Sequence, residues 1–365
     1  MTVNGLKESE ARLFHWGVIG TGSVALKFVA GLRSSNGGVA ALVVGRDAGR
    51  TSAFAHKLKI ADSSVDLLAA VTRPDIDAFY IATPPTAHRE AALACIAAGK
   101  PVLIEKPIAA NSADAAEMVN AARSAGVFAM EGMWTRFLPL LTELRQRLKQ
   151  GEIGEVRSFQ ASFGLPNIAD AGDNQFNAEL GGGALLHRGV YPLALALDLL
   201  GPATLSGSTA TIGRTGVDED VVILLRHQAG GLSTLRASLR VGLSNDVTIE
   251  GTHGRLHIAA PLYRPWRAAL TPTKPILRTS GQRRFELLHE SSFAQGAAQR
   301  LSALRSRSTS ITRHFSGNGY HYEADAVMAA VRAGATECSA MPLSDSLAIA
   351  DLIEAARANW VVRKT

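Results

Sequence analysis

Residues 14–25 read Phe-His-Trp-Gly-Val-Ile-Gly-Thr-Gly-Ser-Val-Ala. The first six residues suit a strand, and the pattern G-x-G-x-x-A begins directly after them at Gly20. Val24, Phe28 and Leu32 then recur at the spacing of one helix face. The order strand, glycine turn, helix is typical of dinucleotide-binding domains, so this context makes the glycine pattern more specific than it is alone.

The small residues of this turn have physical roles. Gly20 allows a tight turn, Gly22 lets a pyrophosphate approach the backbone, and Ala25 permits close packing of helix and strand. The N-terminus of the helix supplies amide donors and the positive end of a dipole. We therefore expect a dinucleotide to bind here.

The second strand candidate, Val39–Val44, is followed by charged residues. At this place an acid binds the ribose hydroxyls of NAD, whereas an arginine favours the 2′-phosphate of NADP. Arg46 comes first and Arg50 lies one helical turn later, while Asp47 suits the N-cap of the next helix. The pattern favours NADP and leaves NAD as the alternative.

A second informative stretch is Gly99–Pro107, Gly-Lys-Pro-Val-Leu-Ile-Glu-Lys-Pro. Its apolar centre suits a strand buried on both faces of a parallel sheet. Ligands of open α/β sheets lie beyond the carboxyl ends of the strands, so Glu105 and Lys106 are expected to point into a cleft. The alternative is a surface ion pair at a strand end.

Strands and helices alternate through the first part of the chain. Ile76–Ala82 is a strand candidate, His88–Ala98 a helix, and a helix over 113–124 and a strand over 127–130 follow. This alternation predicts an α/β domain with a doubly wound parallel sheet, a Rossmann domain.

The pattern changes after Met130. Residues 131–150 suit a linking helix, and strand-like runs then follow at 156–163, 204–212, 221–226, 231–239 and 246–258, interrupted by one helix over 182–200. Helices over 322–333 and 344–360 close the chain. These runs predict an α+β domain on a large, mostly antiparallel open sheet. We expect the domains to be 1–133 and 134–365, with the last helix able to pack back on the first.

The composition is that of a globular protein of 365 residues, 47% hydrophobic and 19% charged. Cys95 and Cys338 have no metal-ligand spacing and form no disulfide framework, so we expect no metal and a cytoplasmic location. No apolar run has the length of a membrane span. The net charge of +6 can favour phosphate-bearing ligands or reflect a basic solvated surface, and no nucleic-acid-binding motif is present.

Residues 278–313 stand apart because they carry seven arginines and many serines. Phe293, Ala297, Leu301 and Leu304 follow helical spacing, so we expect a short amphipathic helix, followed by a mobile loop over 305–312. A lid over the substrate and a plain surface excursion both stay open.

Together these features resemble the Gfo/Idh/MocA family of NAD(P)-dependent oxidoreductases over nearly the whole chain. The motifs are Gly-Val-Ile-Gly-Thr-Gly-Ser at 17–23, Ala-Thr-Pro-Pro at 82–85 with His88, Glu-Lys-Pro at 105–107, Met-Glu-Gly-Met-Trp-Thr-Arg-Phe at 130–137, Gly-Gly-Ala-Leu-Leu-His-Arg-Gly-Val-Tyr at 182–191 and Tyr-His-Tyr-Glu-Ala at 320–324. The last three are similar to the branch of dimeric dihydrodiol dehydrogenases and NADP-dependent D-xylose dehydrogenases.

The resemblance implies particular site residues. On the cofactor side they are Gly20, Thr21, Gly22, Ser23, Val24, Arg46, Arg50, Thr83, Pro84, His88, Glu105, Lys106, Trp134 and Arg136. On the substrate side they are Lys106, Trp134, Arg136, Phe163, His187 and Tyr191. The resemblance also implies a homodimer or homotetramer that pairs through the open sheet of the second domain.

Three residues are candidates for catalysis. Lys106 corresponds to the family's catalytic lysine and Tyr191 to the acid/base of the dihydrodiol branch. A tyrosine, with an ordinary pKa of about 10, needs a neighbouring cation at neutral pH, and Lys106 is suited to provide it. His187 stands where most of the family has an aspartate. It is either a third catalytic group or a packed histidine on the helix face of Tyr191.

The implied reaction is hydride transfer between a nicotinamide cofactor and a hydroxyl or carbonyl group of a sugar, cyclitol or related polyol. A trans-dihydrodiol is the alternative substrate. A non-catalytic NAD(P)-binding regulator is the alternative outside enzymes, and the presence of both Lys106 and Tyr191 argues against it.

Overall fold

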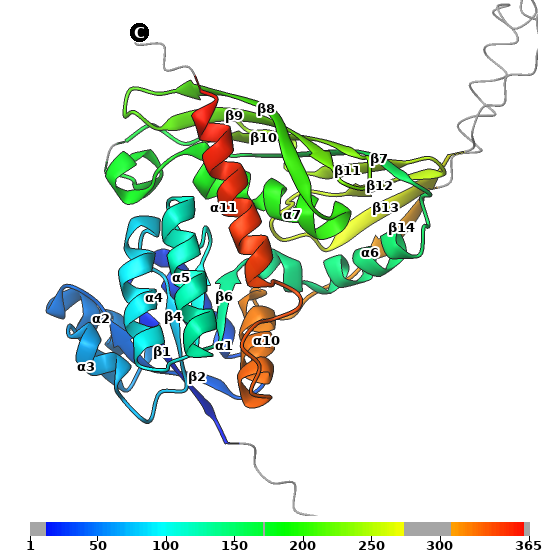
Figure 1. Ribbon diagram of the computed structural model, residues 1–365. Helices are drawn as coiled ribbons and strands as arrows, with labels where there is room; N and C mark the ends of the chain where they lie inside the picture. Colours follow the sequence, from blue (N-terminus) through cyan, green and yellow to red (C-terminus); the bar gives the residue numbers. More distant parts are fainter. Residues whose placement is uncertain (1–11, 171, 274–307, 361–365) are drawn as a thin grey trace, which may run out of the picture. The chain divides into compact units, whose positions relative to one another are not determined.

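The computed structural model describes residues 12–170, 172–273 and 308–360, which divide into two compact units (Figure 1). The first unit comprises Met1–Phe137, Ala178–Gly181 and Ser316–Glu354. The second comprises Leu138–Asn177, Gly182–Phe315 and Ala355–Thr365. The domain boundary at residue 133 stays a prediction.

The first unit contains a sheet of parallel strands. Its elements are β1 (Phe14–Ile19), α1 (Ser23–Leu32), β2 (Gly38–Val44), α2 (Ala48–Leu58), β3 (Asp62–Ser64), α3 (Leu67–Val71), β4 (Ala78–Ile81), η1 (Pro85–Ala87), α4 (His88–Ala97), β5 (Val102–Glu105), α5 (Ser112–Ala125), β6 (Ala129–Gly132), η2 (Trp134–Phe137), η4 (Ala178–Leu180), α10 (Tyr320–Arg332) and most of α11 (Leu343–Ala358). The strand order is β3-β2-β1-β4-β5-β6. The order reverses between β1 and β4, where open α/β sheets bind ligands. The predicted Rossmann sheet is confirmed.

Apolar layers cover both faces of this sheet. Ile19 of β1 belongs to a buried core with residues of α3, α4 and α5, and α4 and α5 lie over one face (Figure 1). Trp16 makes an edge contact with Phe28 of α1. Phe28 in turn stacks on Tyr80 of β4 with ring centroids 3.7 Å apart. Because side chains alternate along a strand, Trp16 and Ile19 anchor opposite layers.

The second unit contains a sheet of eight strands. Its elements are α6 (Pro139–Lys149), β7 (Val156–Gly164), η3 (Asn174–Phe176), η5 (Leu185–Gly189), α7 (Val190–Leu200), β8 (Ala203–Ile212), β9 (Asp218–His227), β10 (Leu232–Ser238), β11 (Val247–Gly251), β12 (Gly254–Ile258), β13 (Arg267–Pro272) and β14 (Thr309–Thr312). The strand order is β14-β13-β12-β11-β7-β10-β9-β8. Neighbours are antiparallel except β7 and β10, which run parallel. The predicted mostly antiparallel sheet is confirmed.

The helix predicted over 182–200 begins later than expected. Gly181 and Gly183 have φ angles of +79° and +125°, so they form a turn instead of the first helical residues. The chain then passes through one π-helical turn, η5, before α7 begins at Val190. His187 lies in the π-helical turn and Tyr191 follows in α7. That their side chains share one face stays a prediction.

Other element boundaries also differ from expectation. Residues 131–132 end β6, and the linking helix begins only at Pro139. The run over 246–258 is two strands, because the chain turns back between Gly251 and Gly254. Residues 309–312 pair with β13 as a strand, so the loop predicted over 305–312 is wrong for that part. The predicted helix over 293–304 lies outside the described residues.

Candidate functional site

The glycine turn after β1 has the geometry that a bound dinucleotide needs. Gly20 has a φ of +118°, and a Cβ there would lie 2.5 Å from the carbonyl oxygen of Ala82. A Cβ on Gly22 would have no atom of the described residues within 4 Å. Gly20 is therefore required by the turn, whereas Gly22 leaves open space over the N-terminus of α1, with Thr21, Ser23 and Val24 around it.

Two guanidinium groups follow β2. Arg46 and Arg50 are both exposed, and neither side chain pairs with another residue in the part of the chain that the structure describes. Asp47 caps α2, because its Oδ1 accepts a hydrogen bond from the Arg50 amide at 2.7 Å. This acid therefore has the structural role that the sequence indicates, and the two arginines can bind a phosphate.

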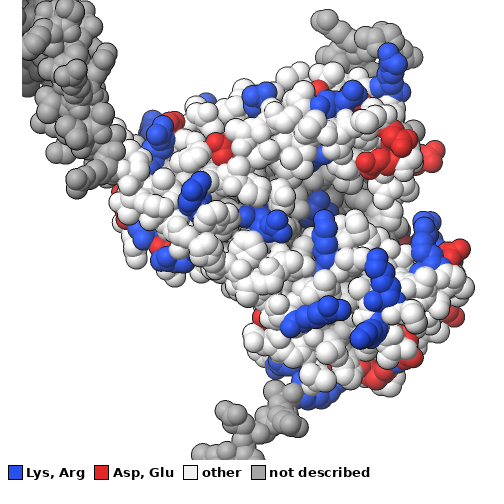
Figure 2. Space-filling model, turned by 180° about the vertical axis from the view of Figure 1, so that it is seen from behind, with Lys and Arg blue, Asp and Glu red and all other residues white. Residues whose placement is uncertain are grey.

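Basic side chains are not confined to one area. On the face drawn in Figure 2, Lys and Arg side chains are spread widely, and several of them have no Asp or Glu between them. This face carries both signs of charge, with the basic side chains more widespread than the acidic ones.

His88 connects two loops at the carboxyl edge of the parallel sheet. Its side chain is 1% exposed. Nε2 lies 2.9 Å from the Thr83 carbonyl after β4, and Nδ1 lies 3.0 Å from the Pro107 carbonyl after β5. Burial lowers the pKa of His88. The histidine therefore holds the Thr83-Pro84 loop and the Lys106-Pro107 loop together from inside. The Thr83 hydroxyl is buried without a hydrogen-bond partner among the described residues, which suits a polar ligand.

Glu105 is the last residue of β5, and its carboxylate is held by two donors. The Tyr80 hydroxyl donates to Oε1, and the Lys106 amide donates to Oε2 at 3.1 Å. Burial raises the pKa of Glu105, against the opposing charge of Lys106. Lys106 itself is half-buried. The Glu105–Lys106 pair is therefore built into the strand end, so it differs from an exposed surface ion pair.

Trp134 and Arg136 are more deeply buried than a ligand-contacting role needs. Trp134 is 4% exposed and stacks on Tyr320 with centroids 4.7 Å apart. Arg136 is 1% exposed, and its Nη1 donates to Asp345 at 2.6 Å. These contacts favour a role in shaping the first unit, and direct ligand contact stays a prediction.

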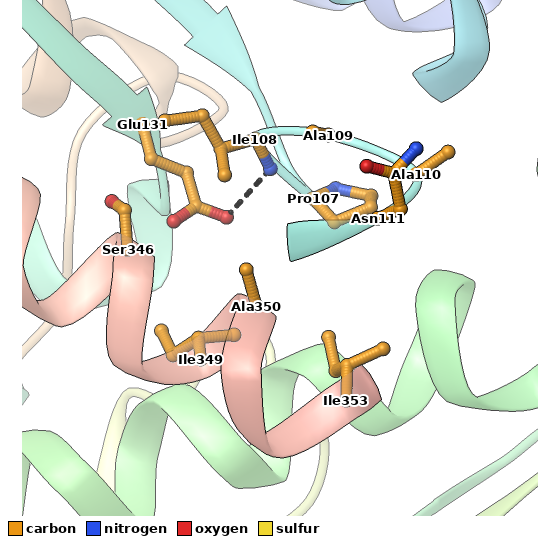
Figure 3. A pocket seen from close by; sticks show the side chains of 10 residues that line it. All are labelled: Pro107, Ile108, Ala109, Ala110, Asn111, Glu131, Ser346, Ile349, Ala350 and Ile353. Carbon is orange, nitrogen blue, oxygen red and sulfur yellow. Dashed lines mark hydrogen bonds between the residues drawn. The ribbon is translucent and has the colours of Figure 1, made fainter. Parts of the chain in front are cut away.

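A small pocket lies behind the Lys106–Pro107 loop (Figure 3). It lies between that loop and Ile349, Ala350 and Ile353 of α11. Glu131 of β6 points into it opposite Ser346, and the Glu131 Oε1 accepts a hydrogen bond from the Ile108 amide at 3.0 Å. Burial raises the pKa of Glu131 to about 7. A buried acid thus fixes the backbone two residues after Lys106.

We expect Glu131→Gln to flatten the dependence of stability on pH. Between pH 4.5 and about 7 the unfolded carboxyl is ionised while the folded one keeps its proton, so wild-type stability falls as pH rises. The glutamine still accepts from the Ile108 amide and removes this loss, which is up to about 3 kcal/mol. Urea unfolding at several pH values measures the free energy of unfolding of both proteins and its dependence on pH. Glu90→Gln, on the exposed surface of α4, is the matched control, and parallel curves for Glu131→Gln and wild type would refute the assignment.

In the second unit, Tyr191 belongs to an aromatic cluster. Its ring, 8% exposed, makes an edge contact with Phe163 at 5.5 Å and lies 6.2 Å from Tyr263. Phe163 also stacks on Tyr263 at 5.1 Å. Phe163 and Tyr191 were expected at the substrate side and do lie together. Tyr263 has no periodic or motif signal in the sequence, and only the fold brings it here.

Two charged residues fix the start of the helix that carries His187 and Tyr191. Asp218 accepts from the Leu185 amide at 2.7 Å, and burial raises its pKa to about 6. Arg188 donates to the carbonyl oxygens of Leu165 and Ser238. It also donates to Gln175 at 3.2 Å, and burial lowers its pKa to about 10. The sequence did not indicate either residue, because buried polar partners far apart in the chain leave no local pattern.

The predicted site residues are shared between the two units. The first unit holds all the predicted cofactor-side residues, including Lys106, Trp134 and Arg136. The second unit holds Phe163, His187 and Tyr191. The described residues include no group of three His, Cys, Asp or Glu that could hold a metal ion.

Among the same residues, no helix has both the length and the apolar character of a membrane span. Burial raises the pKa of Cys95 to about 12, so this thiol is unreactive.

Comparison with known proteins agrees with this geometry. Residues 14–133 match an oxidoreductase family with an NAD-binding Rossmann fold, and residues 141–257 match the Gfo/Idh/MocA C-terminal domain. The chain is 33% identical over 355 residues to trans-1,2-dihydrobenzene-1,2-diol dehydrogenase of Mus musculus, covering 94% of this chain and 95% of that protein. The human enzyme of the same name is 31% identical over 363 residues, with the same coverage of both chains. The chain therefore belongs to the Gfo/Idh/MocA family of NAD(P)-dependent oxidoreductases, as the motifs predict.

Solved structures share the fold. A 3-ketoreductase from Actinomadura kijaniata in complex with NADP and TDP-benzene has a TM-score of 0.79 at 24% identity, covering 96% of this chain and 98% of its own. Levoglucosan dehydrogenase in complex with NADH and levoglucosan has a TM-score of 0.80 at 18% identity, covering 95% and 97%. At these identities the likeness concerns the fold of the two sheets.

Proposed function

We propose that this oxidoreductase uses NADP to transfer a hydride between nicotinamide and a ring hydroxyl or carbonyl group of a sugar, cyclitol or related polyol. The observation that carries the cofactor choice is the pair of exposed guanidinium groups of Arg46 and Arg50 after β2, which are unpaired among the described residues, with Asp47 used as a helix cap. A phosphate between two arginines forms charge-assisted hydrogen bonds that the plain ribose of NAD does not offer.

The proposed chemistry assigns one task to each side chain. Bound nicotinamide supplies the hydride donor or acceptor. Tyr191 Oη moves the proton of the substrate hydroxyl, and the Lys106 ammonium stabilises the phenolate and donates to the same substrate oxygen. The Lys106 loop is held from behind by His88 and Glu131, so the ammonium is positioned before substrate binds.

A trans-dihydrodiol is the second candidate substrate, and two observations favour it. The curated relatives named above carry that activity in their names. The rings of Phe163, Tyr191 and Tyr263 form an aromatic cluster that suits contact with an apolar carbocycle. The same rings can also stack on the C–H face of a sugar, and adjacent ring hydroxyls are common to both substrate classes.

A rate screen separates these possibilities. Purified protein is mixed with NADP⁺ and a panel of aldoses, cyclitols and trans-dihydrodiols, and the absorbance of reduced cofactor is followed. Turnover of one class identifies the substrate. Tight NADP⁺ binding with no turnover on any member would instead support a non-catalytic regulator.

We also propose that the protein is cytoplasmic and forms a homodimer or homotetramer through the eight-stranded sheet. Light scattering in solution tests the oligomeric state.

Arg46→Ala is expected to raise the dissociation constant for NADPH at least about tenfold and to leave that for NADH nearly unchanged. The reason is the loss of one charge-assisted hydrogen bond to the 2′-phosphate, worth roughly 1.5–3 kcal/mol. Fluorescence titration with both cofactors measures this. Arg33→Ala removes another exposed arginine of the same unit, at the far end of α1, and should change neither constant. Equal wild-type affinity for NADH and NADPH would contradict the assignment and make Asp47 the ribose ligand.

A further inference from the structure

Two buried carboxyl groups lie close together at the ends of β5 and β6. Glu323 of α10 is 0% exposed, and neither of its oxygens has a hydrogen-bond partner among the described residues. A Cβ placed on Gly132 would be 3.7 Å from Glu323 Oε2 and 3.4 Å from the Cα of Glu105. Glu105 and Glu323 therefore border the same glycine, in a part of the interior where charge is poorly solvated.

The surroundings of the two acids are unequal. Glu105 accepts hydrogen bonds from Tyr80 and from the Lys106 amide, so its ionised form is supported. Glu323 has no such donor, and burial together with the charge of Glu105 raises its pKa well above the ordinary range. Two neighbouring carboxylates cannot both ionise without a large penalty, so the pair carries one negative charge with the proton on Glu323.

Other charged and titratable groups adjoin this pair from the neighbouring elements. They are Tyr80 of β4, Lys106 after β5, Lys27 of α1 and Glu131 of β6, with Tyr320 of α10 near Tyr80 and Arg136 of η2 near Glu131. Lys27 and Lys106 stabilise the charge on Glu105, whereas Glu131 and Glu105 disfavour each other's ionised forms. A positive charge added beside the pair would therefore favour loss of the proton that Glu323 holds.

We propose that Glu105 and Glu323 hold one proton between them and release it when oxidised, positively charged nicotinamide binds at this edge of the sheet. The inference rests on the proposed function. Both acids lie at the carboxyl ends of β5 and β6, the half of a Rossmann sheet that faces the second nucleotide. In the step, the Glu323 carboxylic acid becomes a carboxylate and its proton passes to solvent. Reduced nicotinamide is neutral, so it leaves the proton in place.

This proton linkage makes the choice between oxidised and reduced cofactor depend on pH. A ligand that expels a proton binds more tightly as pH rises, by up to about tenfold per pH unit for one proton. NADP⁺ affinity is therefore expected to rise with pH while NADPH affinity stays nearly constant. At lower pH the protein would favour the reduced cofactor more strongly.

Calorimetric titration in buffers of different ionisation enthalpy tests the proposal. We expect release of close to one proton for each NADP⁺ bound by wild type, about none with NADPH, and about none with either cofactor in Glu323→Gln. Glu90→Gln, at an exposed position, should behave as wild type. Infrared spectra of the wild-type protein give a reading that needs no variant. At about pH 8.5, above the pKa values of Glu131 and Asp218, the carbonyl band of a buried carboxylic acid should be present without cofactor and weaken with NADP⁺.

The outcomes are distinguishable. Equal proton release by wild type and Glu323→Gln, or an infrared band that NADP⁺ leaves unchanged, would overturn the shared proton while the cofactor assignment stands. Failure of both cofactors to bind would overturn the proposed function, and the cofactor-linked proton with it.

Discussion

Tyr191→Phe and Lys106→Ala are each expected to lower kcat by about 10²–10⁴, the usual range for a positioned proton transfer. The Tyr191 ring is 8% exposed and packs edge-on against Phe163, so phenylalanine keeps the packing and removes only the hydroxyl. Lys106→Ala removes the cation that we propose stabilises the phenolate. NADPH affinity should change by no more than a few fold in either variant. Steady-state kinetics at saturating cofactor measure both changes.

His187→Ala is the comparison for this pair. It should lower kcat less and mainly raise KM, because His187 lies half-buried in the π-helical turn before α7. The pH profile of kcat should lose its basic limb in Tyr191→Phe and keep it in His187→Ala. If the limb disappears with His187 instead, or Tyr191→Phe works at the wild-type rate, then the histidine is the acid/base.

Arg188→Met is expected to lower the free energy of unfolding by about 3–5 kcal/mol. The guanidinium is 4% exposed and satisfies the carbonyl oxygens of Leu165 and Ser238 and the amide oxygen of Gln175. Methionine fills similar space and leaves those acceptors without donors, each at about 1–3 kcal/mol. Denaturant unfolding followed by circular dichroism measures the loss.

Two further variants serve as comparisons for Arg188→Met. Arg188→Lys keeps the charge and part of the donor capacity, so it should lose less stability than methionine. Arg214→Met changes an exposed arginine of the same unit and should shift stability by no more than about 0.5 kcal/mol. A wild-type unfolding curve for Arg188→Met would show that these hydrogen bonds contribute nothing to stability.

The parts of the fold that the sequence predicts are those with a repeating apolar pattern. The strand Phe14–Ile19 and the following helix appear as expected, because the glycine turn and the apolar spacing agree. β3 was missed, since Asp62–Ser64 is a three-residue polar edge strand that pairs only with β2. The break at Gly251 was missed because the apolar pattern continues across the turn.

The candidate site is only partly visible in the sequence. Gly20, Gly22, Arg46 and Lys106 stand directly after strands, where topology alone directs ligands. The buried acids are different, because Glu323 looks like an ordinary polar residue near the start of a helix. Its burial and its approach to Glu105 depend on segments more than two hundred residues apart, and no local pattern encodes that.

The position of β7 has a consequence for how the second unit is made. This strand comes first in its sheet along the chain, yet it lies between β10 and β11. β10 begins about 70 residues after β7 ends, which is roughly 4–14 s at ribosomal speeds of about 5–20 residues per second. In the first unit, β1 meets β2 after about 20 residues. β7 thus waits longer for its neighbours in the sheet than β1 does, and the growing chain is open to misassembly during that interval.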